Sequence, residues 1–192
     1  IERYLQLAAQ DNMWIVQPST PANYFHMLRT QAYKRPRKPL IAFTPKQLLR
    51  LSAAASSIDE FTSGVFQPVI GDAAHLDAAS VTRVLLCSGR LYYDLAKERE
   101  HRGDTSTAII RVEQLYPLPE AEVAAELTQY PNATVTWVQD EPRNQGAWPH
   151  LALNLFPSLA RPVRLVSRPE SATTAAGRAS LHKEQAATLI AQ

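Results

Sequence analysis

The segment from Trp137 to Trp148 holds the densest group of residues that could do chemistry. It combines acids, amides, a glycine and two tryptophans just after an apolar run that is typical of a strand. Binding sites and interfaces form at the carboxyl ends of strands in open parallel sheets, and tryptophan is enriched at interfaces. The pattern predicts a loop at a domain or subunit interface, built from Trp137, Glu141, Asn144, Gln145 and Trp148. The alternative is a well-capped turn whose tryptophans fill the hydrophobic core.

A second group of residues is basic. No acid occurs between Asp11 and Asp59, and the lysines and arginines there give a local charge of +7 in a chain whose net charge is +2. Crowded cations repel one another, and guanidinium groups bind phosphate through paired hydrogen bonds. We hypothesise a site for effector phosphates at Arg29, Lys34, Arg35, Arg37 and Lys38. The alternatives are a solvated surface, cations that complement a helix dipole, and docking of an acidic patch on a partner.

The other reactive side chains form no recognisable catalytic or metal-binding pattern. No two of the five histidines have the i, i+4 spacing of a helical metal pair, and Cys87 lies inside an apolar run, as a buried thiol would. Gly89 follows a predicted strand, but neither a dinucleotide-binding nor a P-loop glycine pattern surrounds it. We therefore expect no catalytic, cofactor-binding or metal-binding residue in this chain.

The composition is that of an ordinary globular protein, with 45% hydrophobic and 20% charged residues. Its 192 residues allow one large domain, or one domain and part of another. No apolar run approaches the roughly 18 residues of a membrane-spanning helix, and no secretory signal is visible. The single cysteine excludes an internal disulfide and suits a reducing compartment. We expect a cytoplasmic protein that binds neither a membrane nor nucleic acid.

The first third of the chain is typical of one parallel strand–helix–strand unit. Apolar runs predict strands at 13–17 and 39–44, and a helix is predicted between them at 22–33. Another helix is predicted at 45–55, and the residues that follow it are polar and irregular. The expected division of the chain is into residues 1–50, a linker at 51–80, and residues 81–192.

Strands and helices alternate in the rest of the chain. Strands are predicted at 81–89, 107–115, 134–139 and 163–167. Helices are predicted at 90–102, 119–130, 147–155 and 178–191. Because each strand is a nearly continuous apolar run, we expect a parallel sheet covered on both faces. The predicted fold class is therefore α/β with a mostly parallel sheet.

The chain begins without Met, and Tyr4, Leu5 and Ala8 have helical spacing with no capping residue before them. We therefore expect this sequence to be the C-terminal part of a longer polypeptide.

Seven motifs are long enough to be specific, and they run nearly from end to end of the chain: RYLQL (3–7), PSTPANYFHMLR (18–29), RKPL (37–40), TPKQLLR (44–50), CSGRLYYD (87–94), IRVEQLYPL (110–118) and QDEPRNQGAW (139–148). Together they resemble the C-terminal part of the thiamine-diphosphate-dependent first component of the bacterial 2-oxoglutarate dehydrogenase complex, a transketolase-like family. The resemblance implies that residues 1–50 end a thiamine-pyrimidine-binding domain and that residues 81–192 form a transketolase-like C-terminal domain.

The resemblance also implies a reaction and its partners. Such an enzyme uses thiamine diphosphate and Mg²⁺, bound mainly outside this chain, to decarboxylate 2-oxoglutarate in the citric acid cycle. The succinyl group then passes to a lipoyl arm of the second component, a succinyltransferase, within a multienzyme complex whose first component is a homodimer. Family members respond to phosphate-bearing effectors such as AMP and acetyl-coenzyme A, which fits the crowded basic residues.

The family's metal motif, its activating glutamate and its substrate-binding histidines would lie upstream of these residues. We therefore expect this chain to be inactive alone and to support the dimer and the architecture of the active site. Two alternatives stay open. One is a free-standing anion-binding or interaction module with the same fold, and the other is the related enzyme that acts on 2-oxoadipate.

Overall fold

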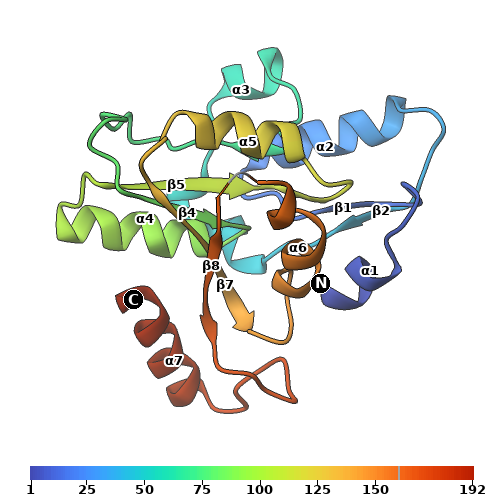
Figure 1. Ribbon diagram of the computed structural model, residues 1–192. Coiled ribbons are helices and arrows are strands. Elements are labelled where there is room, and N and C mark those ends of the chain that lie inside the picture. The colour runs from blue at the N-terminus through green and yellow to red at the C-terminus, as the bar shows by residue number, and fades with distance from the viewer. Residues whose placement is uncertain (160) are drawn as a thin grey trace.

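Two β-sheets organise the computed structural model, which describes residues 1–159 and 161–192 (Figure 1). The larger sheet has the strand order β3 (Val69–Ile70), β5 (Thr107–Val112), β4 (Arg83–Cys87), β7 (Thr134–Pro142) and β8 (Val163–Arg168). The four strands from β5 to β8 are parallel, and β3 pairs antiparallel with β5 at the edge. The predicted α/β class with a mostly parallel sheet is confirmed.

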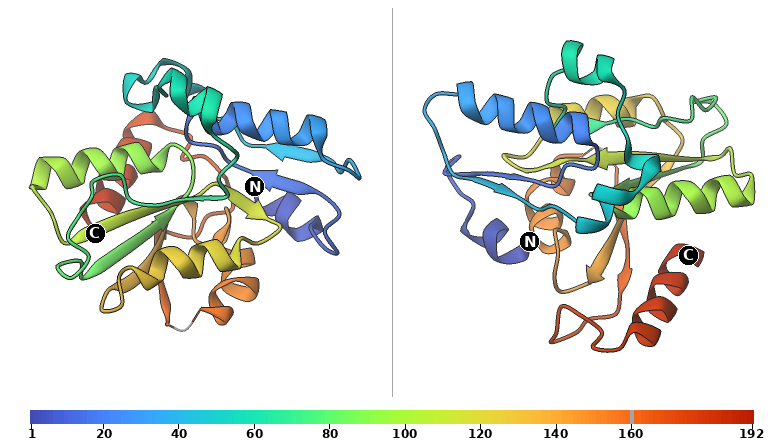
Figure 2. Two further views of the ribbon diagram at one scale, coloured as in Figure 1. Left: turned by 90° about the horizontal axis from the view of Figure 1, so that it is seen from above. Right: turned by 180° about the vertical axis from the view of Figure 1, so that it is seen from behind.

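Both faces of the larger sheet are covered, as the apolar runs predicted. Side chains alternate along β4, so that Val84 and Leu86 face one hydrophobic core and Leu85 and Cys87 face another. The first core is closed by α5 (Glu120–Thr128) and α6 (Trp148–Asn154), which is followed by the 3₁₀ helix η3 (Phe156–Ser158). The second is closed by α4 (Leu91–Arg102) and α7 (Ala179–Ala191). Figure 2 shows α4 and α5 on opposite sides of the sheet.

The smaller sheet joins the N-terminal part of the chain to the segment that follows β5. Its central strand, β1 (Trp14–Val16), pairs in parallel with β2 (Leu40–Ala42) and antiparallel with β6 (Gln114–Tyr116). The helix α2 (Pro21–Tyr33) connects β1 to β2, with the Thr20 hydroxyl accepting a hydrogen bond from the Asn23 amide at 3.2 Å. The first helix, α1 (Glu2–Leu7), packs its buried Leu5 into the core that α6 also lines.

Two predicted strands have different limits in the structure. The strand predicted at 107–115 is divided at Glu113, because β5 pairs with β4 in the larger sheet whereas β6 pairs with β1 in the smaller one. The strand predicted at 134–139 continues to Pro142, where it still pairs with Arg168 of β8. In both cases the pairing partner decides the limit of the strand.

The helix predicted at 45–55 is wrong. The structure has two short 3₁₀ helices instead, η1 (Lys46–Arg50) and η2 (Ser52–Ala54). Their only buried side chain is Ala54, so tertiary packing does not stabilise a longer α-helix here.

The segment 56–79 was expected to be irregular, but the structure shows two regular elements in it. It contains α3 (Ile58–Ser63), which begins with a capping box formed by Ser57 and Glu60. It also contains β3, whose backbone extends the edge of the larger sheet. Among the described residues, no helix has both the length and the apolar character needed to cross a bilayer.

Candidate functional site

A cavity of about 210 Å³ lies where the carboxyl ends of β1, β4 and β7 meet. The C-terminal part of the chain lines most of it, with Ser88 and Arg90 after β4 and the run Gln139–Glu141 in β7. The N-terminal part contributes Ile1, Gln17 and Pro45. This is the edge of a parallel sheet at which ligand sites form.

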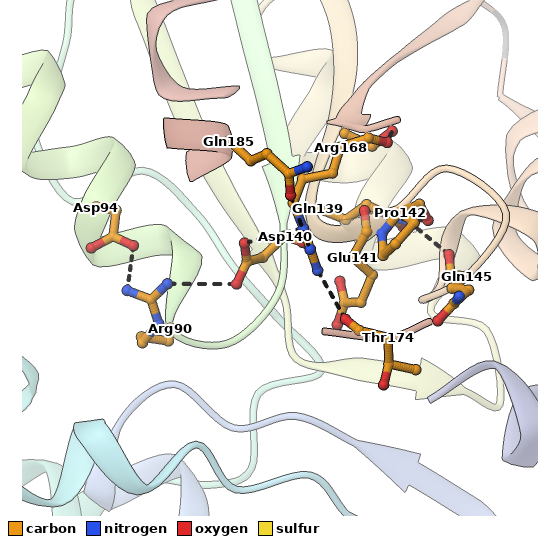
Figure 3. Close-up of polar contacts among 11 residues, drawn as sticks. Arg90, Asp94, Gln139, Asp140, Glu141, Pro142, Gln145, Arg168, Thr174 and Gln185 are labelled. Atoms are coloured by element: carbon orange, nitrogen blue, oxygen red, sulfur yellow. Dashed lines mark hydrogen bonds and ion pairs between the residues drawn. The ribbon is translucent and has the colours of Figure 1, made fainter. Parts of the chain in front are cut away.

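Arginines and carboxylates alternate beside this cavity, and Arg90 and Asp140 of this group line it (Figure 3). The Arg90 guanidinium donates to Asp94, and its Nη2 atom lies 3.7 Å from Asp140 Oδ2. On the other side of Asp140, Arg168 donates through Nε to the Asp140 carbonyl oxygen and through Nη2 to the Thr174 carbonyl at 3.1 Å. Because the acids neutralise the arginines, this group does not attract anions strongly.

Glu141 differs from these paired groups. Its carboxyl group lines the cavity but forms no ion pair with any side chain in the described ranges. Burial raises the pKa of Glu141, and the neighbouring Asp140 carboxylate raises it further. The protonated form of this carboxyl is therefore more favoured than that of an exposed glutamate.

The Gln139 side chain organises the turn after β7. Its Oε1 accepts hydrogen bonds from Trp137 Nε1 at 3.0 Å and from the Trp148 amide at 2.9 Å. Its Nε2 donates to the carbonyl oxygens of Pro142 at 3.0 Å and Gln145 at 2.8 Å. Trp137 is only 1% exposed and packs against Phe156 in the core.

The rest of this turn contacts other segments of the chain. Asn144 Nδ2 and Gln145 Nε2 donate to the Ser171 carbonyl at 3.0 and 2.8 Å, and the Gly146 amide donates to Glu2 of α1 at 3.1 Å. The Trp148 ring lies against Phe156, with 5.6 Å between the ring centres. A role of the five predicted residues at a domain or subunit interface stays a prediction.

The five crowded cations do not converge on one point. Lys38 forms an ion pair with Asp11, because parallel pairing of β1 with β2 brings their preceding residues together. Arg35 and Arg37 both donate to the Ala32 carbonyl, at 3.1 and 3.3 Å, near the end of α2. These two contacts are what cations complementing a helix C-terminus would make.

Arg29 and Lys34 line a hollow of about 540 Å³ together with Tyr33 and Phe66, and Lys34 is also near enough to Asp11 to lower the pKa of that carboxyl group. The Lys34 ammonium is 5.5 Å from the centre of the Trp14 ring, and Arg29 Nη1 donates to the Gly64 carbonyl at 3.4 Å. The effector-phosphate site also stays a prediction.

Comparison with known proteins decides the family. The model of the 2-oxoglutarate dehydrogenase C-terminal family matches residues 55–192, and the model of the transketolase pyrimidine-binding domain matches residues 1–52. The chain belongs to the 2-oxoglutarate dehydrogenase family. It is 47% identical over 99% of its length to the 2-oxoglutarate dehydrogenase E1 components of Cupriavidus necator and Haemophilus influenzae. It is also 45% identical over 96% of its length to the 2-oxoadipate dehydrogenase complex component E1 of Xenopus laevis.

The chain spans about a fifth of the length of these relatives, covering 20 to 21% of each.

The polar side chains that line the cavity show whether thiamine diphosphate and Mg²⁺ could bind there. Among the described residues that line it, Arg90 is the one basic side chain, and it is already paired with Asp94 and Asp140, so a diphosphate group would meet no free cation there. Within the described ranges, no three histidine, cysteine or acidic side chains come together to hold a metal ion. The residues of this cavity do not fit a thiamine diphosphate–Mg²⁺ group.

Proposed function

We propose that this chain forms the C-terminal part of a thiamine-diphosphate-dependent E1 component that decarboxylates 2-oxoglutarate. The observation that carries the proposal is the order of the two family matches, which together cover nearly the whole chain with a pyrimidine-binding segment first and a 2-oxoglutarate dehydrogenase C-terminal segment second. In this proposal residues 1–50 end the pyrimidine-binding domain, 51–80 link it to the next, and 81–192 form the C-terminal domain.

The proposed role of these residues is architectural. The cavity residues do not fit the cofactor, so Mg²⁺ and thiamine diphosphate would be bound mainly outside this chain. This chain would support the homodimer and the walls of the active site of a cytoplasmic enzyme. The succinyl group would leave on the lipoyl arm of a succinyltransferase partner.

The test is an assay of the intact protein. With thiamine diphosphate and Mg²⁺ present, we expect 2-oxoglutarate to reduce an artificial electron acceptor, and we expect no reduction when the cofactor is omitted. Transfer to a lipoyl domain of the succinyltransferase is measured separately by mass spectrometry. Absence of turnover with any 2-oxoacid would overturn the proposal.

One observation favours a second candidate. The relative named as a 2-oxoadipate dehydrogenase component is nearly as similar to this chain as the 2-oxoglutarate dehydrogenase relatives are. The same assay with 2-oxoadipate distinguishes the two, because the ratio of kcat/KM values for the two acids reports the preference of the substrate pocket.

A further inference from the structure

All three polar groups of Ser19 are bonded to residues of the C-terminal part. Its amide donates to Glu113 Oε2 at 2.6 Å, its hydroxyl accepts from Arg111 Nη1 at 3.2 Å, and its carbonyl accepts from the Tyr93 hydroxyl at 2.7 Å. Asn23 Nδ2 donates to the same Glu113 oxygen at 3.0 Å. We call these five residues the Ser19 cluster. It joins the start of α2 to β5 and α4.

The Ser19 cluster contains two buried ionisable side chains, one acidic and one basic. Glu113 is 0% and Arg111 is 7% exposed, and the Arg111 guanidinium carbon lies 4.1 Å from the centre of the Tyr92 ring. Burial raises the pKa of Glu113, whereas the hydrogen bonds from Ser19 and Asn23 and the Arg111 charge lower it. Among the described contacts the two side chains are not bonded to each other, and each is bonded to a different group of Ser19, so Ser19 links them.

Stability alone does not explain these two residues. Glu113 Oε1 and Arg111 Nε are buried and form no hydrogen bond in the described part of the chain. Unbonded buried polar atoms cost free energy, and apolar residues of similar size would avoid that cost. Polar groups in such a place instead fix one geometry of the segments that they join.

The geometry that they fix is that of the cavity wall. The Gln17 amide donates to the Glu113 carbonyl at 2.7 Å, and the Gln17 side chain lines the cavity. Gln17 is also in close contact with Gly89, in the turn that carries Ser88 and Arg90 into the same cavity. Glu113 therefore bonds to both ends of the segment from Gln17 to Ser19.

We propose that Arg111 and Glu113 are positioning residues that hold the segment 17–23 against the larger sheet and thereby set the N-terminal wall of the cavity. The pair acts on the cavity through Ser19 and Gln17. The proposal concerns the shape of the cavity and does not depend on which 2-oxoacid the intact protein uses.

Amide hydrogen exchange in the intact protein tests this proposal, because exchange reports local opening segment by segment. In Glu113→Gln we expect exchange within residues 17–23 to be about tenfold faster, since a neutral amide oxygen accepts more weakly than a carboxylate from the Ser19 amide and from Asn23. Exchange in β4 and β7 should stay unchanged. The double variant Arg111→Met/Glu113→Gln should restore slow exchange in part, because it removes both buried charges.

Tyr93→Phe provides a variant that changes no charge. It removes the bond to the Ser19 carbonyl and the hydroxyl that lies beside Arg111, and we expect faster exchange confined to residues 17–23. The matched control is Tyr92→Phe, which keeps the ring over Arg111 and should change nothing. If Glu113→Gln does not fold, the comparison of Tyr93→Phe with Tyr92→Phe is sufficient to test the proposal.

Three results would overturn the proposal. The first is unchanged exchange within 17–23 in both Glu113→Gln and Tyr93→Phe. The second is faster exchange that spreads equally through β4 and β7, which would indicate general destabilisation. The third is a double variant whose effect is the sum of the single ones, since that would show that the two charges do not act together.

Discussion

At the scale of single residues, Gly89 shows how one side chain would disturb the cavity. Its φ is +62°, and a Cβ atom there would lie 2.6 Å from Gln17 Nε2. We predict that Gly89→Ala lowers the free energy of unfolding by more than the roughly 1–2 kcal/mol that a left-handed conformation costs an alanine. Denaturation in urea measures the loss.

Gly103 is the matched control for this substitution. Its φ is +60°, but nothing lies within 4 Å of where its Cβ would be. Gly103→Ala should therefore lower the free energy of unfolding only by the cost of a left-handed conformation for alanine. Equal losses of unfolding free energy in the two variants would show that the close approach of the added Cβ atom to Gln17 costs nothing.

Two buried groups make stability depend on pH in the alkaline range. Burial raises the pKa of the Cys87 thiol from 9.0 to about 12 and that of the Tyr93 hydroxyl from 10.0 to about 12. Because the folded state favours the neutral forms, their contribution is complete below the unfolded-state values and is lost as pH rises toward 12. We predict that the free energy of unfolding falls above pH 9.

The measurement is the urea midpoint at a series of pH values. Cys87→Ala and Tyr93→Phe should each make the decline shallower, since each removes one titrating group. A decline of the same slope in both variants would contradict this assignment. The same burial predicts that native Cys87 resists alkylation at neutral pH.

At the scale of elements, the segment after α2 separates two explanations for the crowded cations. If the segment binds effector phosphates, Arg35→Ala/Arg37→Ala in the intact protein should weaken binding of AMP and acetyl-coenzyme A about tenfold or more, because charged hydrogen bonds are lost. Titration at fixed ionic strength measures the affinity. This is the outcome that we predict.

Lys38→Ala is the control for this pair, because Asp11 already neutralises the Lys38 ammonium. It should change effector affinity less than the double variant does. If the double variant leaves both affinities unaltered, the two arginines serve only to cap α2 through the Ala32 carbonyl.

The turn between β7 and α6 is predicted to lie at an interface in the intact protein. Trp148→Ala should weaken dimer association and lower activity, because the ring packs against Phe156 beside the bonds that Gln139 makes to the turn. Analytical ultracentrifugation measures the association. Leu153→Ala in the same helix, where the side chain is 78% exposed, is the control. Unchanged association and activity in Trp148→Ala would make this a local turn only.

At the scale of the whole molecule, the residues of the cavity predict that the isolated chain does not bind thiamine diphosphate with Mg²⁺. Arg90, the basic side chain among the described residues of the cavity, is already paired with Asp94 and Asp140, and the described residues contain no cluster suited to a metal ion. Calorimetric titration of the isolated chain should give no heat of binding, with the intact protein as the positive control. Binding in the micromolar range would contradict this prediction.

Local sequence determined most helices and strands of this protein. The run Val84–Cys87 is apolar at every position, which favours a strand buried on both faces and predicts a buried thiol at Cys87, and the structure has both. Thr20 and Pro21 fixed the start of α2 because a cap needs only neighbouring amides. In each case the interactions that decide the structure lie within a few residues of one another.

Only the tertiary structure decided which residues meet at the cavity. Glu113 follows an apolar run without any local mark of its burial, and the pairing of β6 with β1 places it beside Ser19. Asp11 meets Lys38, and Asp140 lies between Arg90 and Arg168, through the order of strands in the two sheets. Periodicity records which face of an element is apolar. The partner of that face is decided by packing between segments far apart in sequence, which no local pattern contains.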